Sequence, residues 1–170
     1  MININNAVQF QHLIWDRIMK SASVVVDATC GNGHDLLYLA ERAQSECHLY
    51  GIDIQEQAVS ASRELLASKK LQSNVTITFL HNSHDIALHQ EIKENTIDLI
   101  IFNLGYLPGG DHSIITRPHN TIEALNNAFP KLAKDGIITI VAYPGTPEGM
   151  EEKEALHEYT IQTLQPHLSK

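Results

Sequence analysis

The chain has 170 residues, of which 43% are hydrophobic, and its formal net charge is −8. This length and composition predict one globular domain with a single core, spanning residues 1–170. The acidic balance argues against a protein that coats nucleic acid through many basic side chains, and no apolar run approaches the roughly 18 residues of a membrane span.

Apolar residues recur with helical or strand spacing along the chain, and the two patterns alternate. The predicted helices cover residues 7–19, 35–43, 55–69, 86–92, 121–132 and 151–164, and the predicted strands cover 23–27, 48–54, 75–80, 97–102 and 136–142. This order predicts an α/β fold with a doubly wound, mainly parallel sheet covered on both faces. Because crossovers are right-handed, the carboxyl ends of the strands meet at one edge, where ligands bind. We therefore expect four residues to lie together there, namely Asp27, Asp53, Ser83 and Asn103.

The first predicted strand runs into a glycine turn and then a helix. Gly31 and Gly33 let the backbone pass close to a ligand, and the helix start presents unpaired N–H groups. A dinucleotide site has a third small residue in its G-x-G-x-x-G/A pattern, but Leu36 occupies that place. Asp27 and Asp35 flank the turn and suit the ammonium of a methionine moiety better than a diphosphate. S-adenosylmethionine (SAM) is therefore the expected cofactor, with NAD as the alternative.

The ends of the next two strands supply further cofactor contacts. Asp53 can bind both hydroxyls of a ribose, a role that NAD sites share. Ser83 stands where methyltransferases usually carry an acid that accepts a hydrogen bond from the adenine amino group, and Asn82 or His84 could assist. Ser83 or Asp85 could instead cap the helix that follows. The predicted cofactor-binding residues are Asp27, Gly31, Asn32, Gly33, Asp53, Gln55, Ser83, His84 and Asn103.

The fourth predicted strand ends at Asn103 and enters a glycine-rich loop. Amino methyltransferases carry an N/D-P-P-Y/F/W loop at this point, where the Asn side chain and a backbone carbonyl accept hydrogen bonds from the target amine and the aromatic ring stacks on the base. Asn103 and Tyr106 match that pattern, whereas Leu104 and Gly105 replace the prolines, which disfavours a planar exocyclic amine. Further along the loop lie two candidate proton acceptors. The predicted catalytic residues are Asn103, Tyr106, Asp111 and His112. Asp111 could instead be a turn residue.

Three segments together resemble the MnmM (YtqB) family of bacterial methyltransferases: D-A-T-C-G-N-G-H-D at residues 27–35, N-L-G-Y-L-P-G-G-D-H at 103–112, and Tyr-Pro-Gly at 143–145. The resemblance spans nearly the whole chain and implies a Rossmann-like class I methyltransferase fold. It also implies methylation of the 5-aminomethyl group of wobble 2-thiouridine, with the anticodon loop of tRNA as the partner. Methylation of ribosomal RNA or of a small amine is an alternative, as is an NAD-dependent oxidoreductase or a cofactor-binding protein without catalysis.

The C-terminal part departs from the usual class I pattern. Two further strands normally close the sheet, but only a helix follows the fifth strand here, so one sheet edge would need a loop or a partner subunit to cover it. A homodimer is one way to do so. Cys30 and Cys47 show no metal-ligand spacing, the histidines show no zinc motif, and the N-terminus lacks a signal-peptide pattern. We therefore expect no metal and a reduced, cytoplasmic protein.

Overall fold

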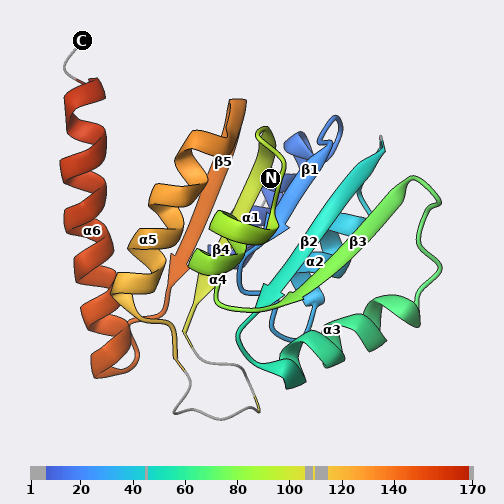
Figure 1. The fold of residues 1–170 in the computed structure, drawn as a ribbon, viewed down its shortest axis with the longest axis horizontal. Coiled ribbons are helices and arrows are strands. Elements are labelled where there is room, and N and C mark those ends of the chain that lie inside the picture. The colour runs from blue at the N-terminus through green and yellow to red at the C-terminus, as the bar shows by residue number, and fades with distance from the viewer. Residues whose placement is uncertain (1–6, 45, 106–108, 110–114, 169–170) are drawn as a thin grey trace.

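The computed structural model describes residues 7–44, 46–105, 109 and 115–168. The strands in this part of the chain form one sheet in the order β3-β2-β1-β4-β5, and all neighbouring strands are parallel (Figure 1). Their bounds are β1 (Val24–Asp27), β2 (Cys47–Asp53), β3 (Val75–His81), β4 (Ile97–Leu104) and β5 (Leu132–Ala142). The predicted α/β fold with a parallel sheet is confirmed.

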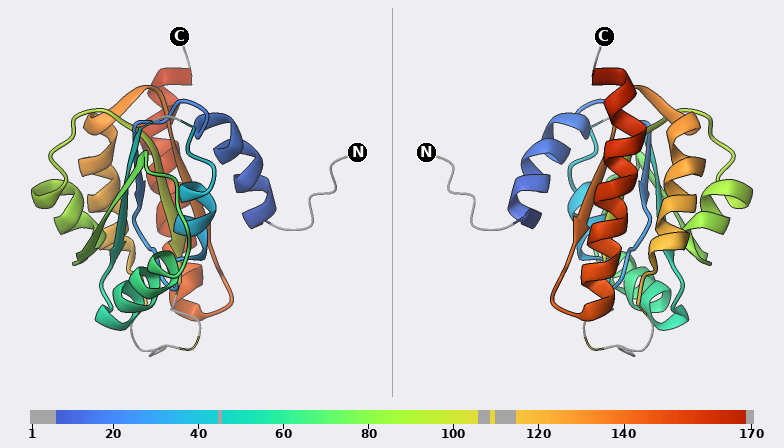
Figure 2. Two further views of the ribbon diagram at one scale, coloured as in Figure 1. Left: turned by 90° about the vertical axis from the view of Figure 1, so that its right-hand side faces the viewer. Right: turned by 90° about the vertical axis from the view of Figure 1, so that its left-hand side faces the viewer.

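Helices cover both faces of this sheet, as the two side views show (Figure 2). One face packs against α1 (Ala7–Ile18), α2 (His34–Ala40) and α3 (Glu56–Ala67). The other face packs against a short α4 (His84–Ile86) that continues as a π-helical turn over Ala87–Glu91, and against α5 (Pro118–Ala128) and α6 (Pro147–Leu168). The sheet is therefore doubly wound, as expected from the alternation of strands and helices.

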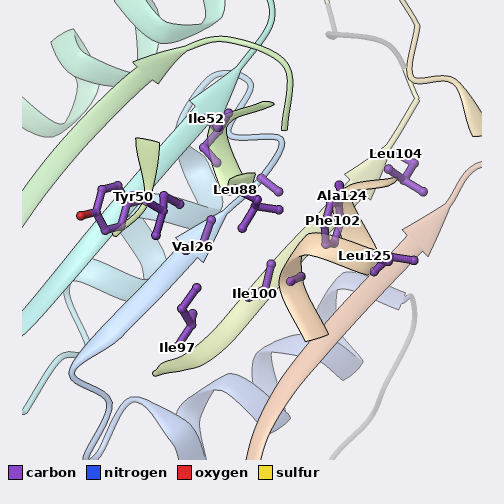
Figure 3. Packing of buried hydrophobic residues seen from close by; sticks show 14 of the residues in the cluster. Val26, Tyr50, Ile52, Leu88, Ile97, Ile100, Phe102, Leu104, Ala124 and Leu125 are labelled. Atoms are coloured by element: carbon purple, nitrogen blue, oxygen red, sulfur yellow. The ribbon is translucent and has the colours of Figure 1, made fainter. Parts of the chain in front are cut away.

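Two hydrophobic cores lie on the two sides of the sheet because successive residues of a strand point to opposite faces. In β1, Val25 belongs to the core under α1 and α2, whereas Val26 belongs to the core under α5. Figure 3 shows the second core, to which Ile100 and Phe102 of β4 and Leu88 belong. Each such buried side chain contributes about 1.5–3 kcal/mol to folding. The central strands are thereby held rigidly, and so are the residues at their carboxyl ends.

Some predicted boundaries are wrong, and local backbone chemistry explains why. The predicted helix over residues 86–92 begins earlier, at His84, and its last turn is π-helical, with the Ile92 N–H bonded to the carbonyl of Ala87, five residues back. The helix predicted over 121–132 begins at Pro118, since a first-turn proline has no N–H to satisfy. It ends at Ala128, followed by a 3-10 turn over Phe129–Lys131.

Leu132, predicted to end that helix, instead begins β5. It pairs with Ile97 of β4, and an irregularity follows before regular pairing resumes at Leu99 with Ile137. Gly136 lies at this irregularity, where a Cβ would come within 2.8 Å of the Ile97 carbonyl oxygen. The final helix is longer than expected and covers Pro147–Leu168.

β5 is an edge strand, at the opposite end of the sheet from β3. Figure 1 shows α5 and α6 beside this edge. Searching the described residues finds no helix that is both long and apolar enough to cross a membrane.

Candidate functional site

The glycine turn after β1 is packed tightly against α3. Gly31 and Gly33 have φ angles of 49° and 82°, in the left-handed region that favours glycine. A Cβ on Gly33 would lie 2.8 Å from the Cα of Ser62 in α3, so a larger residue does not fit. The Ser62 hydroxyl donates a 2.8 Å hydrogen bond to the carbonyl of Gly31. The turn is therefore held in one shape, and it leads directly into the N-terminus of α2.

A cavity of about 990 Å³ lies at the carboxyl ends of the strands. It is at the upper end of the range of about 300–1,000 Å³ for small-molecule sites. The predicted cofactor residues that line it are Gly31, Asn32, Asp53, Gln55, Ser83, His84 and Asn103. The fold thus brings together residues that follow or end four different strands. In the described part of the chain, the predicted residues Asp27 and Gly33 are buried and do not line this cavity.

Asp53 braces the glycine turn from the end of β2. Its Oδ2 accepts a 3.0 Å hydrogen bond from the Gly31 N–H, and its Oδ1 accepts one of 2.9 Å from the Gln55 N–H. Burial raises the pKa of Asp53, and these backbone donors oppose the shift. Each carboxylate oxygen can accept a second hydrogen bond. Asp53 therefore supports the turn and keeps acceptor capacity for a ligand.

The cavity has an acidic character. Burial raises the pKa of Asp27 well above its usual value, and the nearby carboxylates of Asp35 and Asp53 raise it further. Among the described lining residues, Asp35 and Asp53 are the carboxylates and Arg117 is the only lysine or arginine. A site with this charge balance favours a cationic ligand over a diphosphate. The excess of carboxylates over basic side chains therefore argues for a sulfonium cofactor and against a dinucleotide.

His84 lines the cavity and carries an unused ring nitrogen. Its ring packs edge-on against Phe102, with the ring centroids 5.6 Å apart. Burial lowers the pKa of His84, which favours the neutral ring, and the ring is hydrogen-bonded to the backbone of Ala28. Nε2 is buried and has no hydrogen-bond partner among the described residues. A neutral imidazole that donates from one nitrogen accepts through the other, so Nε2 can accept a hydrogen bond from a ligand amino group.

Ser83 precedes α4 at the N-cap position, but the capping role considered above is wrong for its side chain. Its hydroxyl donates to Asp85 Oδ1 at 2.5 Å, and within the described structure no side-chain cap hydrogen bond is made to α4. The Ser83 backbone N–H is bonded to Asn82 Oδ1 at 2.9 Å. Ser83 remains a cavity-lining residue with its hydroxyl hydrogen committed to Asp85.

Asn103, the predicted amine acceptor, lies near the end of β4. Its backbone N–H donates to Thr29 Oγ1 at 2.8 Å, and its side-chain Nδ2 donates to Asp35 Oδ2 at 2.7 Å. Its Oδ1 is buried and lacks a hydrogen-bond partner among the described residues. A buried acceptor left without a partner costs about 1–3 kcal/mol. A cavity-lining residue that carries such an acceptor is a candidate ligand contact.

The other three predicted catalytic residues lie outside the described part of the chain, namely Tyr106, Asp111 and His112. The cavity wall formed by Gly105 and Thr116 is described. Gly105 and Thr116 are joined by two hydrogen bonds, from the Gly105 N–H to Thr116 Oγ1 at 3.0 Å and from the Thr116 N–H to the Gly105 carbonyl at 3.1 Å.

Glu152 of α6 supports this wall from behind. It is 1% exposed, and it accepts hydrogen bonds from the hydroxyls of Thr116 at 2.5 Å and Thr121 at 2.7 Å. Sequence reasoning missed Glu152, because an acid within a helix that is otherwise largely polar has no distinguishing pattern. Tyr143 was noted only as part of the Tyr-Pro-Gly segment and not as a site residue, yet it lines the cavity, and its pKa is raised by burial and by Asp35. Tyr143 directly follows β5, so the rule applied to the other strand ends would have found it.

A five-stranded parallel sheet of this order, with a glycine turn after β1 and a ligand-sized cavity at its carboxyl edge, is shared by dinucleotide-binding domains and class I SAM-dependent methyltransferases. Similar solved structures identify the fold here as that of the class I methyltransferases. The chain belongs to the family described as "Putative rRNA methylase", whose sequence model matches residues 49–169. This match confirms the family resemblance found in the motifs.

Two solved structures of similar chains support the same assignment. A "putative rRNA-methylase" from Clostridium thermocellum is 39% identical, with 93% of this chain and 83% of that chain covered and a TM-score of 0.84. A "putative methyltransferase" from Streptococcus mutans, solved in complex with SAH, is 30% identical, with 95% of this chain and 84% of that chain covered and a TM-score of 0.79.

A curated relative comes from Arabidopsis thaliana, the chloroplastic tRNA (mnm(5)s(2)U34)-methyltransferase. It is 33% identical over 159 residues, which is 90% of this chain. The matched region spans 58% of the relative's own length.

Proposed function

We propose that this protein is a SAM-dependent N-methyltransferase that converts the 5-aminomethyl group of wobble 2-thiouridine in tRNA to 5-methylaminomethyl. The observation that carries the proposal is the convergence on one cavity of a braced glycine turn, two carboxylates and the unpartnered acceptor of Asn103. The glycine turn allows the close approach of a ligand, the carboxylates suit a cationic cofactor, and the Asn103 acceptor suits an amine that needs one.

The residues present fit SAM as the cofactor. Asp53 would accept hydrogen bonds from the ribose hydroxyls with the oxygen capacity that remains beyond its two backbone donors. The unpartnered Nε2 of His84 would accept a hydrogen bond from the adenine amino group, with Ser83 beside it. The acidic lining favours the positive charges of the sulfonium and the ammonium. The bound cofactor supplies an electrophilic methyl group for transfer.

Asn103 and the relatives support the proposed substrate. The Asn103 acceptor can hold an amine N–H, and the Arabidopsis relative is named for methylation at a wobble uridine. We therefore propose the anticodon loop of tRNA as the partner. Ribosomal RNA remains the alternative substrate, since the family description names rRNA. A small amine is a further alternative.

Transfer to an alkyl amine requires loss of a proton first. An alkyl ammonium with a pKa of about 10.4 costs about 4–5 kcal/mol to deprotonate at pH 7. Desolvation in the cavity favours the neutral amine. Asp111 and His112 are the proposed proton acceptors, because they follow Asn103 in the same loop. Tyr106 is proposed to stack on the base that carries the amine.

The decisive experiment combines methyl transfer with nucleoside analysis. Purified protein is incubated with isotopically labelled SAM and either bulk tRNA or ribosomal RNA from a strain in which the gene is deleted. We expect 5-aminomethyl-2-thiouridine to accumulate in the deletion strain's tRNA and to become labelled 5-methylaminomethyl-2-thiouridine in vitro. An unchanged wobble nucleoside together with a missing rRNA methyl group would transfer the assignment to rRNA. Tighter binding of NADH than of SAM would overturn the enzyme class.

The homodimer expected from the sequence also stays a proposal. It is supported by the position of β5 at the edge of the sheet, with Ile137 and Ile140 partly exposed there at 36% and 37%. A second copy would cover that edge. Sedimentation measurements over a range of concentrations test this, and a monomer at every concentration would contradict it.

A further inference from the structure

Asp35, in the first turn of α2, links the proposed amine acceptor to the N-terminal helix. Its Oδ2 accepts a 2.7 Å hydrogen bond from Asn103 Nδ2. Its Oδ1 lies 3.3 Å from His12 Nε2 of α1. Asp35 itself lines the cavity. Three elements that are far apart in sequence, α1, α2 and β4, therefore meet in one polar chain beside the cavity.

The contact with Asp35 determines which way the side-chain amide of Asn103 is turned. An amide carries donors on its nitrogen and acceptors on its oxygen, whereas an ionised carboxylate offers acceptors only. Asn103 must therefore turn its nitrogen toward Asp35, and its Oδ1 must face the other way. That oxygen is buried without a partner in the described structure. The backbone N–H of Asn103 is separately held by Thr29, so only the side-chain orientation depends on Asp35.

We propose that Asp35 is a positioning residue that presents the Asn103 oxygen to the target amine, and that His12 holds Asp35 in place. This inference rests on the proposed amine methylation and names two residues that determine the geometry of its acceptor. Without Asp35, the amide of Asn103 can turn over and present its N–H groups to the amine. A donor in that place repels the N–H groups of the substrate.

His12 is itself fixed by stacking. Its ring stacks on Tyr38 with the centroids 3.7 Å apart, and it contacts the Trp15 ring at 5.0 Å. The Arg42 guanidinium lies 3.3 Å from the centre of the same Tyr38 ring, and Asp16 binds both Arg42 and the Tyr38 hydroxyl. These aromatic and charged contacts restrict the imidazole to a position from which Nε2 reaches Asp35. They give the helix α1 a role in the geometry of the site.

A charge-exchange experiment tests the proposal. Methyl transfer from SAM to tRNA of the deletion strain is measured under single-turnover conditions for Asp35→Asn, Asn103→Asp and the double variant. Asp35→Asn should slow transfer by about 30- to 100-fold, because the new amide can hold the Asn103 oxygen instead of its nitrogen. The double variant restores one carboxylate and one amide in exchanged places, so it should recover at least about tenfold over Asp35→Asn.

Two further variants separate positioning from general effects. Glu56→Gln removes an exposed acid from the first turn of α3 and should leave the rate unchanged, which controls for loss of charge near a helix N-terminus. His12→Phe keeps an aromatic ring against Tyr38 but removes the nitrogen, and it should slow transfer by a smaller factor, about 3- to 10-fold. SAM affinity, measured by calorimetry, should change less than about threefold in His12→Phe and Glu56→Gln. Asp35→Asn removes one of the two carboxylates among the described cavity-lining residues and should weaken SAM binding as well, so transfer rates are compared at saturating SAM.

A second readout does not depend on activity. The side-chain NH₂ signals of Asn103, assigned by their loss in Asn103→Asp, should shift on Asp35→Asn and on His12→Phe but not on Glu56→Gln. If the wild type methylates no RNA while these shifts occur, the proposed function fails and the positioning stands. If the wild type is active but Asp35→Asn keeps its rate, or the double variant recovers nothing, the inference is overturned.

Discussion

Asp53 makes two separable contributions, and replacing it by alanine should reveal both. The carboxylate holds the N–H groups of Gly31 and Gln55 and is proposed to bind the cofactor ribose. Loss of hydrogen bonds to a charged group costs about 1.5–3 kcal/mol. We expect Asp53→Ala to weaken SAM binding by that amount, about 10- to 150-fold in Kd, and to lower the free energy of unfolding by a similar amount.

Asp98 provides a matched control for this substitution. Its carboxylate also accepts two backbone hydrogen bonds, from Ser23 at 2.8 Å and Val24 at 3.0 Å, and it does not line the described cavity. Asp98→Ala should therefore lower stability like Asp53→Ala but leave SAM affinity within about threefold of the wild type. Isothermal calorimetry gives the affinities, and urea denaturation gives the stabilities. Equal losses of SAM affinity in the two variants would refute a ribose contact by Asp53.

Three other outcomes are expected. Burial lowers the pKa of His84, so the unfolded chain takes up a proton at this residue first as the pH falls, and stability is lost below about pH 6.5. In urea titrations the wild type should lose about 1 kcal/mol more of its free energy of unfolding than His84→Gln between pH 7 and 5.5, and equal losses would contradict this. Asn103→Ala should reduce turnover by about 100-fold or more, measured by single-turnover kinetics, while calorimetry should show that SAM affinity is retained. A raised Kd for SAM without a loss of turnover would instead place Asn103 in the cofactor site. Glu152→Ala should lower the free energy of unfolding by about 2–4 kcal/mol, because the buried hydroxyl of Thr121 and the partly buried hydroxyl of Thr116 lose their acceptor. The exposed neighbour changed in Glu151→Ala should cost less than about 0.5 kcal/mol, and similar costs for the two variants would contradict this network.

Strand ends were the most informative part of the sequence. Asp53, Ser83 and Asn103 each close or follow a hydrophobic run, and parallel topology alone requires such residues to meet at one edge. The structure brings them to one cavity. The starts of elements were less predictable: Leu132 looks like the end of a helix, and only its pairing with Ile97 makes it part of β5.

The roles of individual polar side chains depended on contacts that no local pattern encodes. The motif identified Asp27 and Asp35 as equivalent acids flanking a turn, yet Asp27 is 1% exposed while Asp35 lines the cavity and contacts Asn103. His12 and Glu152 carried no signal, because each reaches its partner through the packing of a whole helix on the sheet.

The sequence by itself determined the alternation of strands and helices, the glycine turn and the family, because these depend on hydrophobic periodicity and on the conformations that only glycine tolerates. Tertiary structure decided which end of the Asn103 amide is bonded to Asp35, which carboxylates are buried, and which nitrogen of His84 is free to accept. Hydrogen-bond direction and desolvation belong to pairs of groups that approach within a few ångströms in space. Such pairs exist only once α1, α2 and β4 have packed together.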